Sequence, residues 1–523
     1  MPDRALTLDR EKGAATQQGV ARHNVINARE KSFHFKEIVG LAAMLAIGVG
    51  VRLIAINHPY VGSWSWKHGT NGMIAENFYR HGFNIFYPQI NWAGSAAGYI
   101  GTEFPLVPFI AALLYVPFGV QEWIGRAISV AAFAVSLPFF YLLVKELWDQ
   151  RTAAFASGIY VLVPLGIYAG RSFMPDTLSV GFSIIAVYLF RRWLAEPAST
   201  ALFVASGLAT ALAILVKLPA VLIGVPLLYL AWEKYGAGLF RRKELWVFAA
   251  LSLILPIAWY AHSWLVTLGY YPHQHAAEQP EVVDVGSYVA ILSRTATSSL
   301  TPLVAAGMLA GIFLPPGGRS GRLFHWWLAA VGLYIFLAGN LNYRHAWYQL
   351  PIVPAAAAFA GRAFDLGLRR VRRSADSRAV EAVACALLFA ALAGLAYVYA
   401  KPLYYPWAIP LWKAGNEINR IASPDALVIF ADNGDPIGLY YSRRKGWHAL
   451  NTSRWGNPKN SAQAIAALEE LRRQGASYLV FTRYTVWWLD FYKGFRSYLD
   501  SRYRSVGQTE DYVIFDLSAR GEA

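Results

Sequence analysis

Twelve long apolar stretches follow one another between residues 37 and 400, and they limit the folds open to this chain. A helix of about 20 apolar residues crosses the hydrocarbon core of a membrane. Charged residues make up only 15% of the chain, compared with about a quarter in soluble domains. The sequence therefore predicts a polytopic α-helical membrane protein. The stretches cover residues 37–56, 104–119, 122–144, 152–169, 174–190, 200–216, 219–232, 245–265, 296–314, 323–339, 348–366 and 380–400.

Short basic segments separate many of these stretches, as in Arg191–Arg192, Arg241–Lys243 and Arg369–Arg373. Such segments mark cytoplasmic loops, and they explain the net charge of +15 without a nucleic-acid partner. If all of them lie inside, the chain crosses only once between residues 56 and 145. Stretch 104–119 is short and contains three prolines, so we assign it as a non-crossing interfacial or re-entrant helix. About eleven transmembrane helices result, with the N-terminus inside and the C-terminus outside.

The predicted domain organisation has three parts. Residues 1–36 are polar, so we interpret them as a cytoplasmic segment before a retained anchor rather than as a cleaved signal. Residues 37–402 form the transmembrane domain. Residues 403–523 contain short apolar runs of strand length around the amphipathic stretch Ser461–Arg473, which predicts a soluble α/β domain outside the membrane. The single cysteine, Cys385, rules out a disulfide framework.

Ionisable residues on the predicted outer side are the first candidates for function, because charge is costly within the membrane. Glu103 and Asp176 are outward carboxylates, either of which could take a proton from a hydroxyl acceptor. Lys217 precedes a proline between two apolar half-spans and could bind a phosphate as a point charge. The structural alternatives are a helix N-cap or first-turn acid for Asp176 and a snorkelling lysine for Lys217. His262 could bind a metal with Glu103, although a lone histidine is more often a hydrogen-bonded structural residue.

Five segments of the predicted outer side share one family pattern: Trp64–Tyr79, Glu103–Leu106, Arg171–Asp176, Lys217–Pro219 and His345–Pro351. Their order and spacing resemble the lipid-dependent GT-C glycosyltransferases. More narrowly, they resemble the bacterial branch related to protein O-mannosyltransferases and to the aminoarabinose transferase of lipid A. The similarity spans about residues 37 to 365. It implies a first outer loop, residues 57–122, that folds into juxtamembrane helices, and transfer of a sugar from a polyprenyl-phosphate donor to an acceptor at the outer face.

The resemblance also implies roles for single residues. Glu103 and Asp176 would be the catalytic carboxylates, on opposite sides of a donor or metal pocket. The sequence leaves open whether a divalent metal is a cofactor, with Glu103 and His262 as its candidate ligands. For Arg344, His345 and Tyr348, which are among the residues expected at the donor, the structural alternative is an interfacial aromatic belt. Contacts with the donor phosphate or substrate would come from Lys67, His68, Asn71, Arg171, Lys217, Arg344, His345 and Tyr348.

One position departs from the family pattern. Many relatives carry an aspartate in the first loop just before an Ile-Ala-x-Asn-Phe segment, where this sequence has Thr70 and Asn71. The usual base is therefore missing. The change is compatible with a different acceptor, since a phosphate acceptor needs no strong base, with a base at another position, or with an inactive homologue.

Two other classes of protein remain open alternatives at this point. A transporter or flippase usually carries ionisable residues and broken helices near the middle of the membrane, whereas most spans here carry none. A non-catalytic receptor or assembly subunit would explain the missing aspartate. For a transferase, the acceptor is a protein, a lipid or a polysaccharide, and a bacterial inner membrane with a periplasmic active site is the expected location. In the soluble part, Asp432–Asp435 is expected to be a turn rather than a site.

Overall fold

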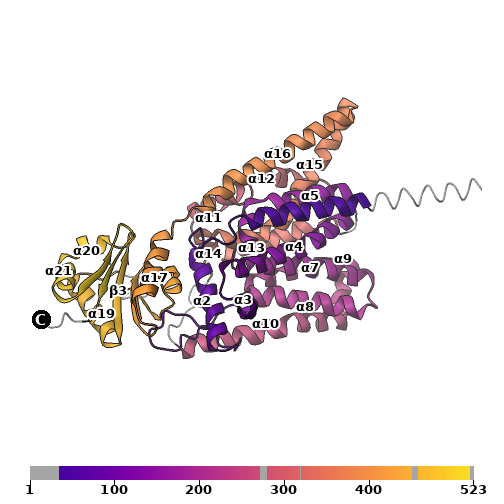
Figure 1. The fold of residues 1–523 in the computed structure, drawn as a ribbon. Coiled ribbons are helices and arrows are strands. Elements are labelled where there is room, and N and C mark those ends of the chain that lie inside the picture. The colour runs from indigo at the N-terminus through magenta and orange to yellow at the C-terminus, as the bar shows by residue number, and fades with distance from the viewer. Residues whose placement is uncertain (1–34, 271–279, 319, 450–456, 519–523) are drawn as a thin grey trace, which may run out of the picture.

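The computed structural model describes residues 35–270, 280–318, 320–449 and 457–518. A bundle of helices, most of them running in roughly one direction, is followed by a small sheet domain that lies beyond one end of the bundle (Figure 1). The first helix has its described part at residues 35–53. The bundle then contains α2 (Ser65–His81), α3 (Leu106–Phe118), α4 (Glu122–Leu147), α5 (Gln150–Leu162), α6 (Pro164–Ala169), α7 (Asp176–Ala195), α8 (Thr200–Val216), η1 (Leu218–Ile223), α9 (Gly224–Tyr235), η2 (Gly236–Arg241), α10 (Lys243–Gly269), α11 (Val285–Arg294), η3 (Thr295–Ser299), α12 (Pro302–Ile312), α13 (Leu323–Leu337), α14 (Gly339–Arg344), η4 (Ala346–Ile352), α15 (Val353–Ala375), α16 (Arg378–Ala400) and η5 (Lys401–Tyr404).

Four helices in the described part of the chain are long and apolar enough to cross a membrane: α4, α7, α10 and the segment Arg378–Tyr404. A fifth would come from Val285–Ser299 and Pro302–Ile312, two helices bent by 109° at a short break. The chain is thus a multi-pass membrane protein, and the count of eleven spans remains a prediction. Most other predicted spans are short or interrupted, as where Pro164 separates α5 from α6, because proline cannot continue the hydrogen-bond ladder of the preceding turn.

The apolar stretch 104–119, predicted not to cross, forms the 13-residue helix α3. At 1.5 Å per residue such a helix is about 20 Å long, which is shorter than the hydrocarbon core of about 30 Å. Its length agrees with a helix that stays at one face of the membrane.

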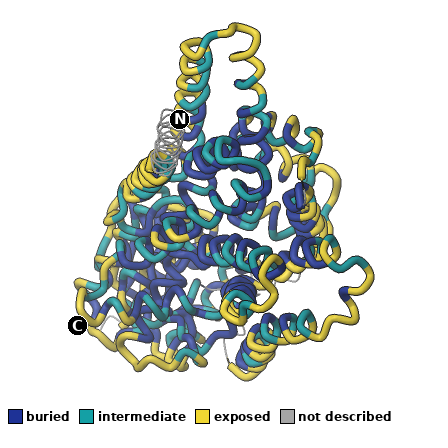
Figure 2. Tube along the Cα trace, turned by 90° about the vertical axis from the view of Figure 1, so that its right-hand side faces the viewer, coloured by how far each residue is buried: buried dark blue, intermediate teal, exposed yellow. Residues whose placement is uncertain are grey.

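The core of the bundle is closely packed around α15. Ala355 to Ala358 are completely buried there, and small side chains let neighbouring backbones approach closely. Gly361 shows how close this approach is, since a Cβ atom at that position would lie 2.4 Å from the backbone nitrogen of Ala156 in α5. Viewed end-on, buried residues fill the middle of the bundle and exposed ones surround it, while the α15–α16 hairpin projects from one side (Figure 2).

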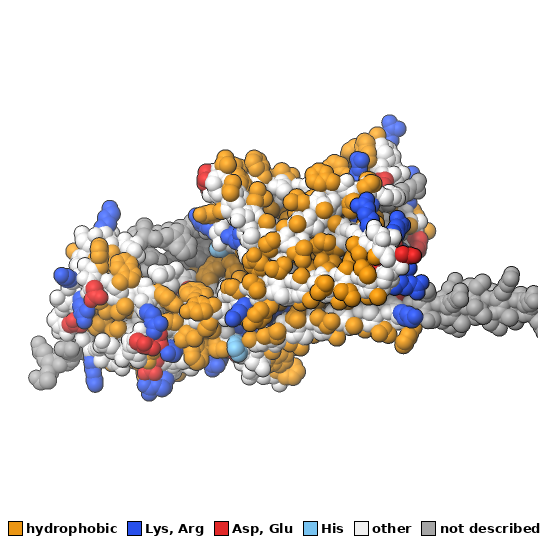
Figure 3. Space-filling model, turned by 90° about the horizontal axis from the view of Figure 1, so that it is seen from above, with side chains coloured by type: hydrophobic (Ala, Val, Ile, Leu, Met, Phe, Trp, Pro, Cys, Tyr) orange, Lys and Arg blue, Asp and Glu red, His pale blue; other side chains and the backbone are white. Residues whose placement is uncertain are grey.

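Charge is distributed unevenly along the bundle. Arginine and lysine side chains gather at the end opposite the sheet domain, next to the start of the described chain (Figure 3). Several are held in ion pairs there, for example Arg369 with Asp365 at 2.6 Å and with Asp149 at 2.8 Å. This segregation agrees with the predicted cytoplasmic loops.

The C-terminal part is a mixed five-stranded sheet with helices, ordered β2-β1-β3-β5-β4. β1 pairs in parallel with β2 and β3, whereas β5 pairs antiparallel with β3 and β4. The predicted α/β character and the predicted helix Ser461–Arg473 are confirmed. The elements are α17 (Ile409–Ile421), β1 (Leu427–Ala431), α18 (Ile437–Ser442), β2 (Gly446–His448), α19 (Ser461–Arg473), β3 (Ala476–Thr482), α20 (Trp487–Phe491), α21 (Lys493–Arg502), β4 (Arg504–Gln508) and β5 (Tyr512–Asp516).

The sheet domain shares a hydrophobic core with the first loop of the bundle. Met73 and Phe78 of α2 belong to the same buried cluster as Leu411 and Tyr440 of the C-terminal part. Polar contacts also cross this boundary, such as the backbone bond from the Gly446 nitrogen to the Asn91 oxygen at 2.9 Å. The first loop is therefore held between the bundle and the sheet domain.

Candidate functional site

Two lysines and two carboxylates meet at the end of the bundle that faces the sheet domain. The Lys217 ammonium donates a hydrogen bond to Glu103 Oε1 at 2.6 Å and lies 3.4 Å from Asp176 Oδ1. Lys67 Nζ lies 3.6 Å from the other oxygen of Glu103. Lys67, Lys217 and Asp176 are buried, while the Glu103 side chain retains 19% of its exposure. The four charges balance, as a buried ionic cluster requires.

Each of these side chains lies where a helix begins or ends. Lys217 is the extended residue after α8, and Pro219 in the following turn prevents the α-helix from continuing. Glu103 lies in the segment before α3. The Phe104 nitrogen donates a backbone hydrogen bond to the Leu215 oxygen at 3.2 Å, and this bond holds the segment in place. Asp176 is the first residue of α7, so its structural alternative, a first-turn acid, is true as well.

Lys67 reaches the cluster from the other side, on α2. Burial lowers the pKa of Lys67, and the negative charge of Glu103 counteracts this effect. The ammonium also lies 5.2 Å from the ring centre of Trp66, a distance at which cation–π attraction contributes. An anion entering the site would therefore meet two ammonium groups at short range.

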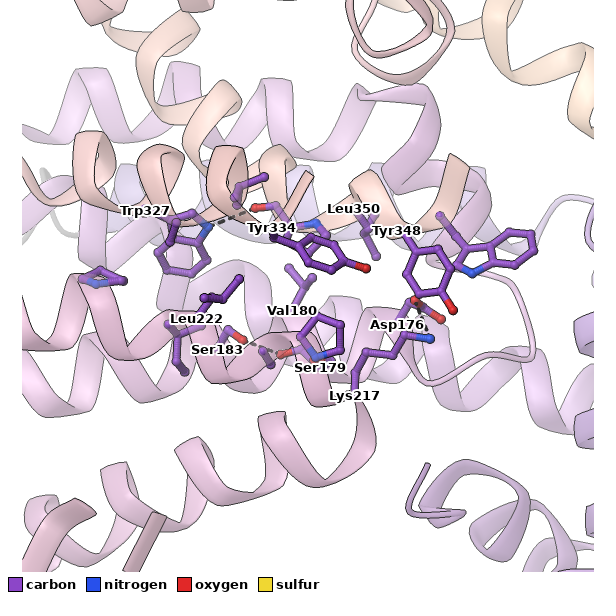
Figure 4. A pocket seen from close by; sticks show the side chains of 18 residues that line it. Asp176, Ser179, Val180, Ser183, Lys217, Leu222, Trp327, Tyr334, Tyr348 and Leu350 are labelled. Carbon is purple, nitrogen blue, oxygen red and sulfur yellow. Dashed lines mark hydrogen bonds and ion pairs between the residues drawn. The ribbon is translucent and has the colours of Figure 1, made fainter. Parts of the chain in front are cut away.

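A cavity that is partly open to solvent extends from this cluster into the bundle. Asp176, Lys217 and Tyr348 line one end of it, and Trp327 and Leu222 line the other (Figure 4). The Lys217 ammonium lies 4.7 Å from the ring centre of Tyr348. The cavity thus runs from a charged end to an apolar end, which suits an amphipathic molecule with an anionic head.

A stack of aromatic rings lies beside the cluster. His345 stacks on Trp347 with ring centres 4.3 Å apart and faces Trp66 of α2 at 6.1 Å. Burial lowers the pKa of His345 to about 4, and the charges of Lys67 and Lys217 act in the same direction. The imidazole is consequently neutral at physiological pH.

Of the residues expected at the donor phosphate, two donate hydrogen bonds to the backbone and a third is buried in an aromatic contact. Asn71 donates to the Phe173 backbone oxygen at 2.7 Å. Arg171 donates to the Ala55 backbone oxygen at 2.5 Å. His68 is buried, packs edge-on against a tyrosine ring, and has a pKa well below its usual value because of burial. The contacts of Asn71 and Arg171 explain these two residues as parts of the fold, whereas both ring nitrogens of His68 have no hydrogen-bond partner among the described residues. The predicted role of all three at the donor phosphate stays a prediction.

The predicted metal pair gains no support. His262 Nε2 lies 2.8 Å from the Phe86 backbone oxygen, within a separate aromatic group, whereas Glu103 contacts the two lysines. Across the described ranges, no group of three or more His, Cys, Asp or Glu side chains could hold a metal ion. Arg344 is exposed at the end of α14.

The sequence-based reasoning missed three residues around the site. Trp66 contacts Lys67, while Tyr334 and Trp347 line the cavity. Trp347 lies inside the recognised segment His345–Pro351 and could have been chosen from it. Tyr334 lies within an apolar stretch, where only its hydroxyl distinguishes it from the surrounding side chains.

Comparison with known families and structures follows the same region of the chain. Residues 102–262 match the model of the dolichyl-phosphate-mannose-protein mannosyltransferase family. This range contains Glu103, Asp176 and Lys217. A comparison with the sequences of curated proteins finds no match.

Solved membrane-protein structures resemble the whole chain. ArnT from Cupriavidus metallidurans bound to undecaprenyl phosphate is similar with a TM-score of 0.62 and 16% identity, over 92% of this chain and 98% of ArnT. The oligosaccharyltransferase AglB from Archaeoglobus fulgidus, in complex with an inhibitory peptide and a dolichol-phosphate, is similar with a TM-score of 0.58 and 13% identity. The match covers 93% of this chain and 74% of AglB. The mycobacterial arabinofuranosyltransferase AftD is similar with a TM-score of 0.52 and 13% identity, over 92% of this chain and 42% of AftD. The resemblance seen in the sequence is confirmed at the level of the fold: this chain has the GT-C fold of these structures, and residues 102–262 match the mannosyltransferase family model.

Proposed function

We propose that this chain is an integral-membrane glycosyltransferase that moves a sugar from a polyprenyl-phosphate donor to an acceptor at the outer face of the membrane. The observation that carries the proposal is the cavity, which joins an apolar end to a cluster of two lysines and two carboxylates. A prenyl chain would occupy the apolar end, and its phosphate would lie at the lysines. The GT-C fold and the polyprenyl phosphates bound to ArnT and AglB support the same assignment.

The two lysines would bind the phosphate. In the structure both of them contact Glu103. A phosphate that carries negative charge would compete with this carboxylate for the ammonium groups, because both anions form charge-assisted hydrogen bonds with lysine. Binding of the donor would therefore release Glu103 from at least one lysine. Asp176 would keep Lys217 in position.

The transfer step would then use Glu103 as the base. An acceptor oxygen attacks the anomeric carbon of the sugar, the bond from that carbon to the phosphate oxygen breaks, and polyprenyl phosphate leaves as an anion held by Lys67 and Lys217. The proton of an acceptor hydroxyl passes to Glu103, which is the more exposed of the two carboxylates and can be reached from outside the cavity. Glu103 would thus replace the first-loop aspartate that is missing at Thr70 and Asn71.

The distribution of charge supports the proposed location. The basic end of the bundle would face the cytoplasm, and the cluster, the first loop and the sheet domain would then lie on the outer side (Figures 1 and 3). In a bacterium this is the periplasmic side of the inner membrane. Residues 403–523 would form an outer domain that supports the first loop.

The test is a titration of the detergent-purified protein with a polyprenyl-phosphate-linked hexose, followed by assay of released polyprenyl phosphate. Glu103→Gln should still bind the donor but lose release, since only the base is removed. Glu76→Gln is the matched control, because Glu76 is also a carboxylate of the first loop but bonds Arg80 at 2.7 Å.

Two results would count against the proposal. If the well-folded wild type bound no polyprenyl-phosphate sugar, the lipid-donor assignment would be lost. If wild type and Glu103→Gln both bound the donor and neither released polyprenyl phosphate with protein, lipid or polysaccharide acceptors, a non-catalytic subunit would be the better interpretation.

A further inference from the structure

Three buried polar atoms at the wall of the cavity have no hydrogen-bond partner among the described residues. They are Asp176 Oδ2, the Tyr334 hydroxyl and Trp347 Nε1. Their residues are only 5%, 7% and 4% exposed. A buried polar group without a partner is destabilising, so native proteins retain few of them. Three around one cavity indicate that a polar ligand normally supplies the missing partners.

Three polar side chains farther along the cavity wall form hydrogen bonds within the protein. Trp327 Nε1 donates to the Pro351 oxygen at 2.9 Å, and the Ser179 hydroxyl donates to the Ala213 oxygen at 3.0 Å. The Ser183 hydroxyl donates to the Ser179 oxygen at 2.7 Å. These residues extend toward the apolar end, which is therefore ready for a hydrocarbon chain. The unmet hydrogen-bonding capacity is confined to the charged end.

Tyr334 has a particular place in this arrangement. It belongs to α13, and its hydroxyl points along the cavity toward Tyr348, Asp176 and Lys217 (Figure 4). Seen from the apolar end, Tyr334 comes before the Lys217 ammonium. A lipid phosphate bound at Lys217 would consequently have Tyr334 on the side where the lipid chain leaves it.

We propose that the Tyr334 hydroxyl donates a hydrogen bond to the lipid-side oxygens of the bound phosphate and fixes the position of the head group in the cavity. This inference rests on the proposed function and adds a binding residue to it. Trp347 Nε1 is a second uncharged donor at the same end. Tyr334 is a positioning residue, because it acts on the leaving phosphate and not on the anomeric carbon.

Tyr334→Phe tests the inference, because it removes the hydroxyl and keeps the ring, whose centre lies 6.4 Å from the ring centre of Tyr348. The probes are undecaprenyl phosphate and undecaprenol, which lacks the phosphate. A hydrogen bond to a charged group contributes about 1.5 kcal/mol or more, so the variant should bind undecaprenyl phosphate at least about tenfold more weakly. Binding of undecaprenol should be unchanged. Tyr397→Phe is the control, since Tyr397 is 65% exposed on α16.

Stability of the lipid-free protein separates binding from folding. The variant loses a buried hydroxyl that has no partner, so its thermal midpoint without lipid should equal or exceed that of wild type. Its increase in midpoint on adding undecaprenyl phosphate should be smaller. In addition, KM for a polyprenyl-phosphate sugar should rise more than kcat falls.

The outcomes are distinguishable. If wild type binds undecaprenyl phosphate and Tyr334→Phe binds it equally well, the inference about Tyr334 is wrong and the proposed function stands. An equal loss for phosphate and alcohol would assign Tyr334 to packing of the chain and also overturn the inference. If wild type shows no phosphate-dependent binding at all, the proposed function itself fails.

Discussion

Replacement of Asp435 by asparagine should make the protein more stable at neutral pH. Asp435 is buried where the sheet domain meets α2, and its two oxygens accept hydrogen bonds from the Ser65 hydroxyl at 2.8 Å and from the Ile437 nitrogen at 3.0 Å. Burial raises the pKa of Asp435 to about 6, and the neighbouring Asp432 acts in the same direction, while His448 opposes it. An asparagine can keep both contacts without the cost of a buried charge.

The magnitude follows from the pKa difference between the folded and unfolded states. An aspartate in the unfolded chain titrates near 3.9, so the folded state binds this proton more tightly. Stability from this group is complete below about pH 4, is lost as the pH rises to about 6, and stays lost above that. Two pKa units correspond to roughly 3 kcal/mol at most. Asp435→Asn should therefore gain up to about 3 kcal/mol at pH 7.5 and nothing at pH 4.

The assay is the thermal unfolding midpoint of the detergent-purified protein, measured by tryptophan fluorescence at several pH values between 4 and 8. Asp490→Asn is the control, because the Asp490 side chain is 80% exposed. Wild type and Asp435→Asn should converge as the pH falls toward 4, and the control should follow wild type throughout. A variant less stable than wild type at pH 7.5 would refute the reasoning, since it would show that the ionised carboxylate is stabilised by its surroundings.

Three further substitutions test the site and its frame. Lys217→Gln removes the central ammonium and should weaken binding of undecaprenyl phosphate at least about tenfold in a titration. Gly101→Ala should lower donor turnover, because a Cβ atom there would lie 2.1 Å from a backbone oxygen of α10 and would displace the segment that carries Glu103. Gly394→Ala is the control and should leave turnover unchanged, since a Cβ atom there has nothing within 4 Å. Arg171→Gln loses its bond to the Ala55 oxygen and should lower the thermal midpoint while donor affinity changes less than about twofold.

Patterns that depend on neighbouring residues were readable from the sequence. The soluble α/β part was visible because strands and amphipathic helices have distinct periods, and α19 begins and ends at the predicted residues. Charge segregation was visible because basic loops alternate with apolar stretches. The break after Lys217 could also be foreseen, because Pro219 follows it closely.

Partners that are distant in the sequence were not readable in this way. Arg171 looked like a phosphate ligand, yet its guanidinium reaches a backbone oxygen 116 residues away. Tyr334 gave no signal, since its role depends on which wall of the bundle it faces. The span count is the least determined feature, because an apolar stretch reveals its length but not whether its helix breaks or bends, as Val285–Ser299 and Pro302–Ile312 do.

The shared core between the first loop and the sheet domain means that the C-terminal part cannot be treated as a detachable module. Removing it would uncover the face of α2 at Gly69 and Gly72, against which Ile437 and Tyr440 pack, and the same helix carries Lys67 into the charged cluster. A chimaera that exchanged this domain for that of a relative would have to preserve the surface formed by Tyr440 and Ile437 against α2. The soluble domain thus constrains which relatives could exchange parts with this chain, although all four charged groups lie outside it.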